Sequence, residues 1–227
     1  MNIAIIPARG GSKRIPRKNI KTFHGKPMIA YSIEAALKSG CFDDVIVSTD
    51  DEEIAAIALQ YGATVPFMRP ADISDDYATT LDVIAHALTW CQQNQMDVEN
   101  ACCIYATAPF IRVSDVQDGL SALIDSVRYV FSATRYAFPI QRALKMNQQD
   151  RVEMFHPEHL NTRSQDLEEA YHDAGQFYWG KAQAFLNKEP IFSSNSKAVL
   201  LPRKRVQDID TQEDWELAEA LYRVIEC

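Results

Sequence analysis

The sequence lacks the features of a membrane or secreted protein. No apolar run approaches the roughly 20 residues needed to span a bilayer, and no signal peptide precedes the first predicted strand. A basic excess is also missing, because 23 Lys and Arg face 31 Asp and Glu, a net charge of −8. A general nucleic-acid binder would carry a basic face or stripe. We therefore expect a cytoplasmic protein whose partners are neither membranes nor nucleic acids.

Cysteine is too irregular in its spacing for a disulfide framework or a zinc site. The five cysteines are odd in number and form no C-x-x-C pair. In a reducing compartment, cysteines of this kind are typically free and buried. We expect that state for Cys41, Cys91, Cys102, Cys103 and Cys227.

Two common phosphate-binding patterns are missing as well, G-x-x-x-x-G-K-S/T and a G-x-G-x-x-G that opens a helix. The chain instead begins with a different pattern. The apolar run at residues 3–6 ends at Pro7, and a loop with two adjacent glycines, Gly10 and Gly11, follows it. The same loop carries Ser12 and five cations, Arg9, Lys13, Arg14, Arg17 and Lys18.

This loop has the chemistry of an anion-binding site. Adjacent glycines allow a backbone of positive φ and close approach to a ligand, so that N–H groups can converge on phosphate oxygens. The loop also follows a predicted strand directly, and open α/β sheets bind ligands at the carboxyl ends of their strands. The alternative is a solvated basic turn. A cationic loop in an acidic chain favours a polyphosphate site.

Length and periodicity predict one α/β domain over residues 1–227, with a mainly parallel sheet and helices on both faces. A hydrophobic content of 47% in 227 residues allows one sizeable core. The expected strands are 3–6, 44–48, 63–67, 102–105, 129–133, 176–179 and 198–201. The expected helices run from Lys26 to Gly40, from about 52 to 62, through 84–91, and over 113–124, 181–185 and 214–225.

The alternation of strands and helices breaks at about residues 139–175. This stretch is rich in Arg, Lys and His and has few periodic apolar residues, so it is not expected to hold an inner strand. Insertions of this kind form lids or dimer arms. We expect a small dimerisation and sugar-binding insertion.

Two carboxylates near the end of the chain could bind a divalent metal. Asp208 and Asp210 alternate, so on an extended segment both side chains point to the same side. Mg²⁺ prefers oxygen ligands and needs only one or two carboxylates beside a phosphate. Spacing alone leaves a second possibility open, which is that these residues cap the helix that begins near Asp214.

The stretch IIPARGGSKRIPRKN resembles the signature of the sugar-activating cytidylyltransferases, which join an acidic sugar to CMP, and the resemblance extends from residue 3 to about 222. It implies a Rossmann-like nucleotidyltransferase fold, CTP as a substrate, a homodimer, and Mg²⁺ as cofactor with Mn²⁺ as a possible substitute. In that family the D-x-D-T segment supplies metal ligands, which favours the metal role for Asp208 and Asp210. The residues that the resemblance assigns to catalysis are Arg9, Lys18 and Asp210.

The same resemblance assigns residues to the nucleotide. Arg69 with the two threonines after it implies a cytosine pocket, whereas Arg14 and Arg17 are expected to be only solvated. The full nucleotide-binding set is Ala8, Arg9, Gly10, Ser12, Lys13, Asn19, Arg69, Thr79 and Thr80.

The residues expected near the sugar are most similar to those of the pseudaminic acid branch of the family. The segments that carry this resemblance are RSQDLEEAYHDAGQFYWG and CIYATAPF. The resemblance implies the reaction of CTP with pseudaminic acid, an acidic nine-carbon sugar, to give CMP-pseudaminic acid and diphosphate. The alternatives are N-acetylneuraminic, legionaminic or ketodeoxyoctonic acid as the sugar, or a non-catalytic nucleotide-binding dimer module. The residues expected to meet the sugar are Tyr105, Thr107, Arg163 and Gln176.

Overall fold

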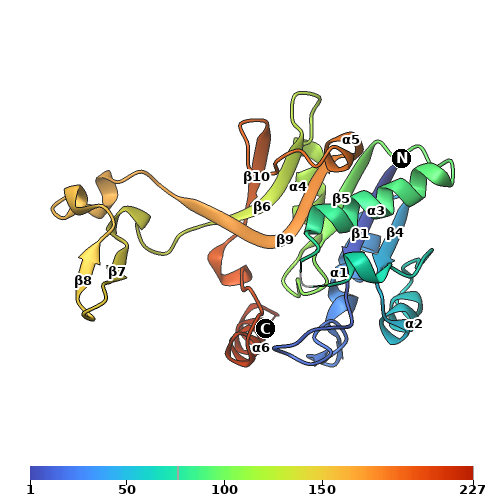
Figure 1. Ribbon diagram of the computed structural model, residues 1–227, viewed down its shortest axis with the longest axis horizontal. Helices are drawn as coiled ribbons and strands as arrows, with labels where there is room; N and C mark the ends of the chain where they lie inside the picture. Colours follow the sequence, from blue (N-terminus) through green and yellow to red (C-terminus); the bar gives the residue numbers. More distant parts are fainter. Residues whose placement is uncertain (76, 227) are drawn as a thin grey trace.

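The computed structural model describes residues 1–75 and 77–226, and a six-stranded sheet forms its centre (Figure 1). The strand order is β10-β6-β9-β5-β1-β4. β1 pairs in parallel with β4 and β5, and β10 pairs in parallel with β6. The strands are β1 (Asn2–Pro7), β4 (Asp44–Ser48), β5 (Asn100–Ile104), β6 (Tyr129–Arg135), β9 (Tyr171–Lys181) and β10 (Ser196–Leu200). The predicted, mainly parallel sheet is confirmed.

Helices cover both faces of this sheet. This is required because successive side chains of β1 point to opposite faces and are apolar on both. Ala4 and Ile6 pack into a core with α1, α2 and α4, whereas Ile3 and Ile5 pack on the other face with α3 and α5. A third cluster joins α6 to the short hairpin of β2 (Thr22–Phe23) and β3 (Lys26–Pro27). The helices are α1 (Met28–Ser39), α2 (Glu52–Gln60), α3 (Thr80–Gln93), α4 (Val113–Ala122), α5 (Ala182–Leu186) and α6 (Gln212–Glu226).

β9 is the antiparallel member of the sheet, and it begins earlier than expected. It pairs with both β5 and β6 and starts at Tyr171, inside the stretch predicted to lack an inner strand, so that prediction is wrong there. The register with β6 shifts between Phe131 and Ala133, next to Gly175 at φ +62°. This bulge interrupts the apolar alternation that would have marked the strand in the sequence.

The strand expected at residues 63–67 does not form. Isolated bridges, Ile46 to Thr64 and Thr49 to Met68, link this segment to β4 and to the residue after it in place of a ladder. Pro66 lies between these bridges and has no N–H to donate, which prevents a continuous ladder.

Residues from about 139 to 170 form an arm that projects from the body and joins it through β6 and β9 (Figure 1). Its regular elements are short: the 3₁₀ turns at Ile140–Arg142, Pro157–His159 and Ser164–Asp166, and the hairpin of β7 (Leu144–Met146) and β8 (Val152–Met154). The arm and its root expose many large apolar side chains, namely those of Phe138, Ile140, Leu144, Met146, Val152, Phe155 and Leu160. This much exposed apolar surface on a thin element is typical of an interaction surface.

A buried ion pair anchors the segment that leads to the two predicted metal ligands. Arg205, in the 3₁₀ turn Arg203–Arg205, donates to both carboxylate oxygens of Asp115 on α4, and the Nη2–Oδ1 distance is 3.0 Å. Each of the two side chains is only 8% exposed. Gln176 adds a hydrogen bond of 2.6 Å from its Nε2 to the carbonyl of Arg205. The backbone before Asp208 is therefore fixed to the sheet and to α4.

The cysteines of the described residues are free, as expected, but they are not all buried. Cys91, Cys102 and Cys103 are free and buried, Cys41 is free and half-buried, and Cys227 lies outside the described residues. Burial raises the pKa of the Cys91 thiol to about 11. Within residues 1–75 and 77–226, no helix has the length and apolar character needed to cross a bilayer.

Candidate functional site

A cavity of about 360 Å³ opens at the carboxyl ends of β1 and β5. Four separate segments line it: the loop after β1, the segment from Arg69 to Val83, the loop after β5, and Asp210 near the start of α6. Of the residues predicted to bind nucleotide, sugar or metal, the lining contains Arg9, Ser12, Lys13, Lys18, Asn19, Arg69, Thr80, Tyr105, Thr107 and Asp210. The fold therefore brings residues from both ends of the chain, such as Arg9 and Asp210, to one site.

The loop after β1 differs from expectation in how it uses its glycines. Neither Gly10 nor Gly11 has a positive φ, and the left-handed residue of the loop is Arg17 at φ +56°. Gly10 is required for space instead, because a Cβ there would lie 2.6 Å from Oδ2 of Asp51. A Cβ on Gly11 would meet nothing within 4 Å.

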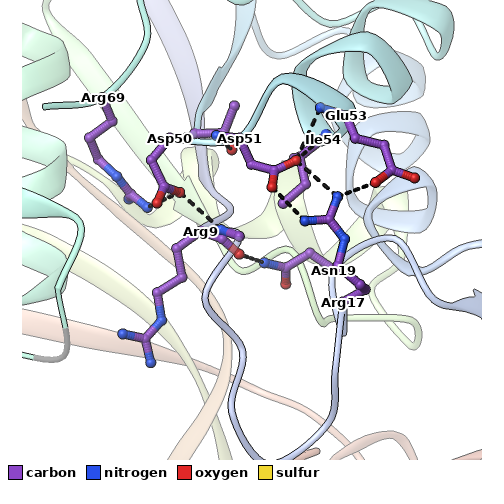
Figure 2. A network of polar contacts seen from close by, with 10 residues as sticks. Arg9, Arg17, Asn19, Asp50, Asp51, Glu53, Ile54 and Arg69 are labelled. Atoms are coloured by element: carbon purple, nitrogen blue, oxygen red, sulfur yellow. Dashed lines mark hydrogen bonds and ion pairs between the residues drawn. The ribbon is translucent and has the colours of Figure 1, made fainter. Parts of the chain in front are cut away.

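Three polar contacts fix the start of this loop, and Figure 2 shows the two that involve Asp50 and Asn19. The Gly10 amide donates to Oδ1 of Asp50 at 2.9 Å, and Nδ2 of Asn19 donates to the Arg9 carbonyl at 2.9 Å. Arg9 itself donates from Nη1 to the carbonyl of Asp75 at 3.1 Å. Asn19 thus holds the backbone of the loop while lining the cavity, whereas the amide of Gly10 is directed at Asp50.

Arg14 and Arg17 are not merely solvated, so that expectation is wrong. Arg17 forms a two-pronged ion pair with Asp51, with Nη2 at 2.9 Å from Oδ1, and also contacts Glu53. Hydrogen bonds from Arg17 hold the pKa of Asp51 at about 2, below its usual range. Arg14 pairs with Asp210 at 2.9 Å. Their partners lie far along the chain, which is why the sequence did not reveal these roles.

Asp208 and Asp210 do not cap α6. Thr211 does so instead, because its Oγ1 accepts from the amide of Asp214 at 3.2 Å, while Oδ2 of Asp214 accepts from the amide of Thr211 at 2.7 Å. Lys18 lies 3.4 Å from Oδ1 of Asp210 and donates to the carbonyl of Ile209 at 2.6 Å. The capping alternative is therefore removed.

The environment of Asp208 would favour a cation. Loss of hydration raises the pKa of the Asp208 carboxyl, and the negative charge of Asp210 raises it further. Ile209 between them is buried, and the two carboxylates are near enough for the charge of Asp210 to act on Asp208. Asp208 itself lies outside the cavity lining. Among the described residues, no group of three or more His, Cys, Asp or Glu side chains is arranged to hold a metal ion.

Arg69 is buried rather than a surface cation. Its side chain is only 3% exposed, its Nε donates to Oγ of Ser74 at 3.1 Å, and its Nη2 lies 3.7 Å from Asp50. Burial lowers the pKa of this guanidinium, and Asp50 opposes the shift. Ser74 and Asp75 also line the cavity and were missed, because no periodicity or motif marks this short loop.

The two threonines after Arg69 have separate roles. Thr79 is outside the cavity lining and forms a capping box for α3 with Asp82. The hydroxyl of Thr80 lies in the cavity and shares a hydrogen bond of 3.1 Å with that of Tyr105. Burial raises the pKa of Tyr105, whose ring packs against Tyr178 with centroids 5.4 Å apart. Tyr178 in turn donates to Asp173, and neither of these two was anticipated.

Two residues predicted to meet the sugar do not line the cavity of this chain. Arg163 lies on the arm, 71% exposed, and pairs with Asp166 at 2.7 Å. Gln176 is 3% exposed and donates to the backbone of Arg205. The predicted residues outside the cavity lining are Ala8, Gly10, Thr79, Arg163, Gln176 and Asp208.

The space beside Gly10 yields a prediction with a matched control. Gly10→Ala should displace the loop, because the new Cβ would meet Asp51, whereas Gly11→Ala should be tolerated. Overpacking of this kind costs about 1–3 kcal/mol. If the loop loses that much binding free energy, calorimetry should show a roughly 5- to 150-fold weaker affinity of Gly10→Ala for inorganic tripolyphosphate. Gly11→Ala should bind like the unmodified protein, and equal losses in the two variants would contradict the close contact.

Comparison with known proteins agrees with this geometry. The family model described as "Cytidylyltransferase" matches residues 3–225. The chain is 48% identical over 224 residues to "Pseudaminic acid cytidylyltransferase" of Campylobacter jejuni subsp. jejuni serotype O:23/36 (strain 81-176), covering 98% of this chain and 97% of that one. It is 30% identical to "CMP-N,N'-diacetyllegionaminic acid synthase" of Legionella pneumophila subsp. pneumophila (strain Philadelphia 1), with 96% and 95% coverage.

Among solved structures, CMP:2-keto-3-deoxy-manno-octonic acid synthetase complexed with CTP superposes with a TM-score of 0.72. The sequence identity to it is 18% and the alignment covers 99% of both chains, so this likeness concerns the fold. It confirms the nucleotidyltransferase fold, and the sequence relatives confirm the resemblance found in the loop after β1. The chain belongs to the cytidylyltransferase family.

Proposed function

We propose that this chain transfers CMP from CTP to pseudaminic acid and releases diphosphate. The observation that carries the proposal is the single cavity in which Arg9, Lys13 and Lys18 converge with Asp210. Such a site can bind a triphosphate and neutralise the charge that forms during phosphoryl transfer. Relatives 48–49% identical over 98% of the chain are named for this reaction, which favours this sugar over the related acids.

The reaction needs positioned charge rather than a covalent nucleophile. A sugar hydroxyl attacks the α-phosphorus of CTP, an oxygen–phosphorus bond forms, and the bond from that phosphorus to the leaving diphosphate breaks. Negative charge spreads over the phosphoryl oxygens in the transition state. Arg9, Lys13 and Lys18 lie where they can stabilise that charge, and the hydroxyl of Ser12 can donate a hydrogen bond to it.

Arg69 is proposed to read the cytosine base. A guanidinium in a buried position interacts more strongly with a carbonyl acceptor than it would in water, because less solvent competes for it. Arg69 and Thr80 line the same cavity as the cationic loop. CTP should therefore be used far better than UTP, ATP or GTP.

We propose that Asp208 and Asp210 hold Mg²⁺, with Mn²⁺ as a possible substitute. The residues fit: the negative charge of Asp210 adds to the cost of ionising Asp208, and a divalent cation would remove that cost. The bound metal would supply charge neutralisation at the phosphate oxygens. Lys18 holds the segment in place through the carbonyl of Ile209, and the carboxylate of Asp210 faces Lys18 and Arg14 of the loop.

A homodimer formed through the arm completes the proposal. The exposed apolar side chains of the arm would be buried by a second copy, and Arg163 would then reach the sugar site of that copy. A guanidinium is a suitable bidentate partner for the carboxylate of the sugar. This arrangement explains why Arg163 lies outside the cavity of its own chain. A purely nucleotide-binding dimer is less favoured, because it would need no carboxylate beside the cationic loop.

The choice of sugar is tested by competition. Pseudaminic acid and N-acetylneuraminic acid, mixed with limiting CTP, should give mainly CMP-pseudaminic acid by product mass. Tyr105 offers an apolar ring where a polyhydroxylated tail would need hydrogen bonds, and a buried unpaired polar group costs about 1–3 kcal/mol, or roughly 5- to 150-fold in kcat/KM. Tyr105→Gln should narrow the preference and Tyr105→Phe should keep most of it. Predominance of CMP-N-acetylneuraminic acid would refute the assignment.

The metal site is tested by paired substitutions. Asp210→Asn should lower kcat by at least about 100-fold, because both the proposed metal ligand and the charge facing Lys18 are lost. Asp208→Asn should have a smaller effect that higher Mg²⁺ concentrations partly offset. Glu213→Gln, an exposed change on α6, is the control and should have normal activity. An Asp210→Asn enzyme with near-normal rates at ordinary Mg²⁺ would remove the metal hypothesis.

The dimer is tested by sedimentation and by mixing variants. Phe155→Asp should yield monomers of low activity, because it places a charge in the proposed apolar interface, whereas Gln149→Asp at the hairpin tip should leave the dimer intact. Each of Arg163→Ala and Asp210→Ala should be inactive alone. Mixed dimers of the two should regain activity, since one site then has both residues. An active monomer at assay concentration would exclude this arrangement.

A further inference from the structure

Asp50 lies between the two parts of the cavity that would hold opposite ends of a nucleotide. It lies just beyond β4, after Thr49, and precedes Asp51, the N-cap of α2. One of its oxygens, Oδ1, accepts the amide of Gly10 at 2.9 Å and lies 3.7 Å from Nη2 of Arg69 (Figure 2). Asp50 itself does not line the cavity. It therefore contacts the cationic loop and the buried arginine without reaching the ligand space.

Arg69 needs a counter-charge, because burial of its guanidinium is costly. Among the described residues, Asp50 is the carboxylate paired with it. The backbone of Arg69 is fixed to the segment between β4 and α2 that contains Asp50, since the Arg69 amide donates to the Thr49 carbonyl at 2.7 Å. Ser74 holds Nε, so Asp50 determines the direction of the remaining guanidinium edge.

The loop after β1 is held against the same segment between β4 and α2. Gly10 packs so closely on Asp51 that a Cβ there would not fit, and Arg17 binds Asp51 further along the loop. The amide of Gly10 donates to the same Asp50 oxygen that faces Arg69, so a change at Asp50 affects the loop and Arg69 together.

We infer that Asp50 is a positioning residue that sets the placement of Arg69 relative to the cationic loop, so that the base and the triphosphate of one nucleotide are bound at the same time. The inference rests on the proposed function, because it assigns the base to Arg69. Loss of the Asp50 charge would leave the guanidinium unpaired and free to turn toward the phosphates, which lowers selectivity for the base rather than affinity for phosphate.

Two substitutions separate the contacts of Asp50. Asp50→Asn keeps an oxygen that can accept from Gly10 but removes the charge facing Arg69, whereas Asp50→Ala removes both. By calorimetry, Asp50→Asn should bind CTP roughly tenfold more weakly and inorganic tripolyphosphate within about twofold of the unmodified protein. The preference of Asp50→Asn for CTP over UTP should fall together with its affinity for CTP. Asp50→Ala should lose affinity for CTP and tripolyphosphate alike.

Controls distinguish positioning from a general change of charge or stability. Glu52→Gln removes a charge from the same end of α2 without touching the loop, and should leave all three affinities unchanged. In an Arg69→Ala background, Asp50→Asn should have no further effect on the ratio of CTP to UTP affinity. The melting temperature of each variant, measured alongside, reports any loss of fold.

Three results would overturn the inference. One is an unchanged ratio of CTP to UTP affinity in Asp50→Asn. Another is an equal loss for CTP and tripolyphosphate in Asp50→Asn, which would indicate a structural role alone. The third is tighter tripolyphosphate binding in Asp50→Ala, which would make Asp50 a competitor for the loop. These are binding measurements without sugar, so they stay informative even if the proposed transfer to pseudaminic acid fails.

Discussion

Five positive charges within the ten residues from Arg9 to Lys18 repel one another, and the end of the molecule that carries the site is built around this constraint. Carboxylates from elsewhere in the chain supply the counter-charge. Asp51, at the start of α2, pairs with Arg17, and Asp210, before α6, pairs with Arg14 and Lys18. These ion pairs hold the loop in place without a bound anion. A preorganised site of this kind avoids part of the ordering cost of binding.

The counter-charges can act only if their own segments are fixed. Asp51 is held because it caps α2 by accepting from the amides of Glu53 and Ile54. Asp210 depends on the buried pair of Arg205 and Asp115, which attaches the preceding backbone to α4. Removal of one partner from such a pair typically costs about 3–5 kcal/mol, because the other charge is left buried and unpaired. The site thus depends on a contact well outside the cavity.

The arm and β9 show how one strand serves both the core and the periphery. The end of β9 lies in the middle of the sheet, with Phe177 and Trp179 buried, while its beginning at Tyr171 leads out of the arm. The bulge near Gly175 separates these two halves. The arm is therefore carried on a strand fixed between two others, which gives it a defined direction despite its exposed surface.

Much of the fold could be predicted from local pattern. Apolar runs predicted β1 and β4, and helical periodicity predicted α1 and α6, because these elements bury one side or both sides in a regular way. Two predictions were wrong, the strand at 63–67 and the lack of an inner strand where β9 begins. A proline breaks the regular pattern in the first segment and a bulge breaks it in the second. Residues such as Ser74 and Asp173 carry no local signal at all, since their contacts depend on which segments meet in space.

The sequence by itself determined the chemistry available at the site: a cationic loop with room for an anion, two alternating carboxylates, and the family to which they belong. Local residue order is sufficient for this, because the loop and the carboxylates each lie within a short stretch. Only the tertiary structure decided which charge meets which. It paired Arg14 with Asp210 and Arg17 with Asp51, buried Arg69 beside Asp50, and placed Arg163 outside its own cavity. Ion pairs depend on distances through space, and these distances follow from the packing of the sheet rather than from separation along the chain.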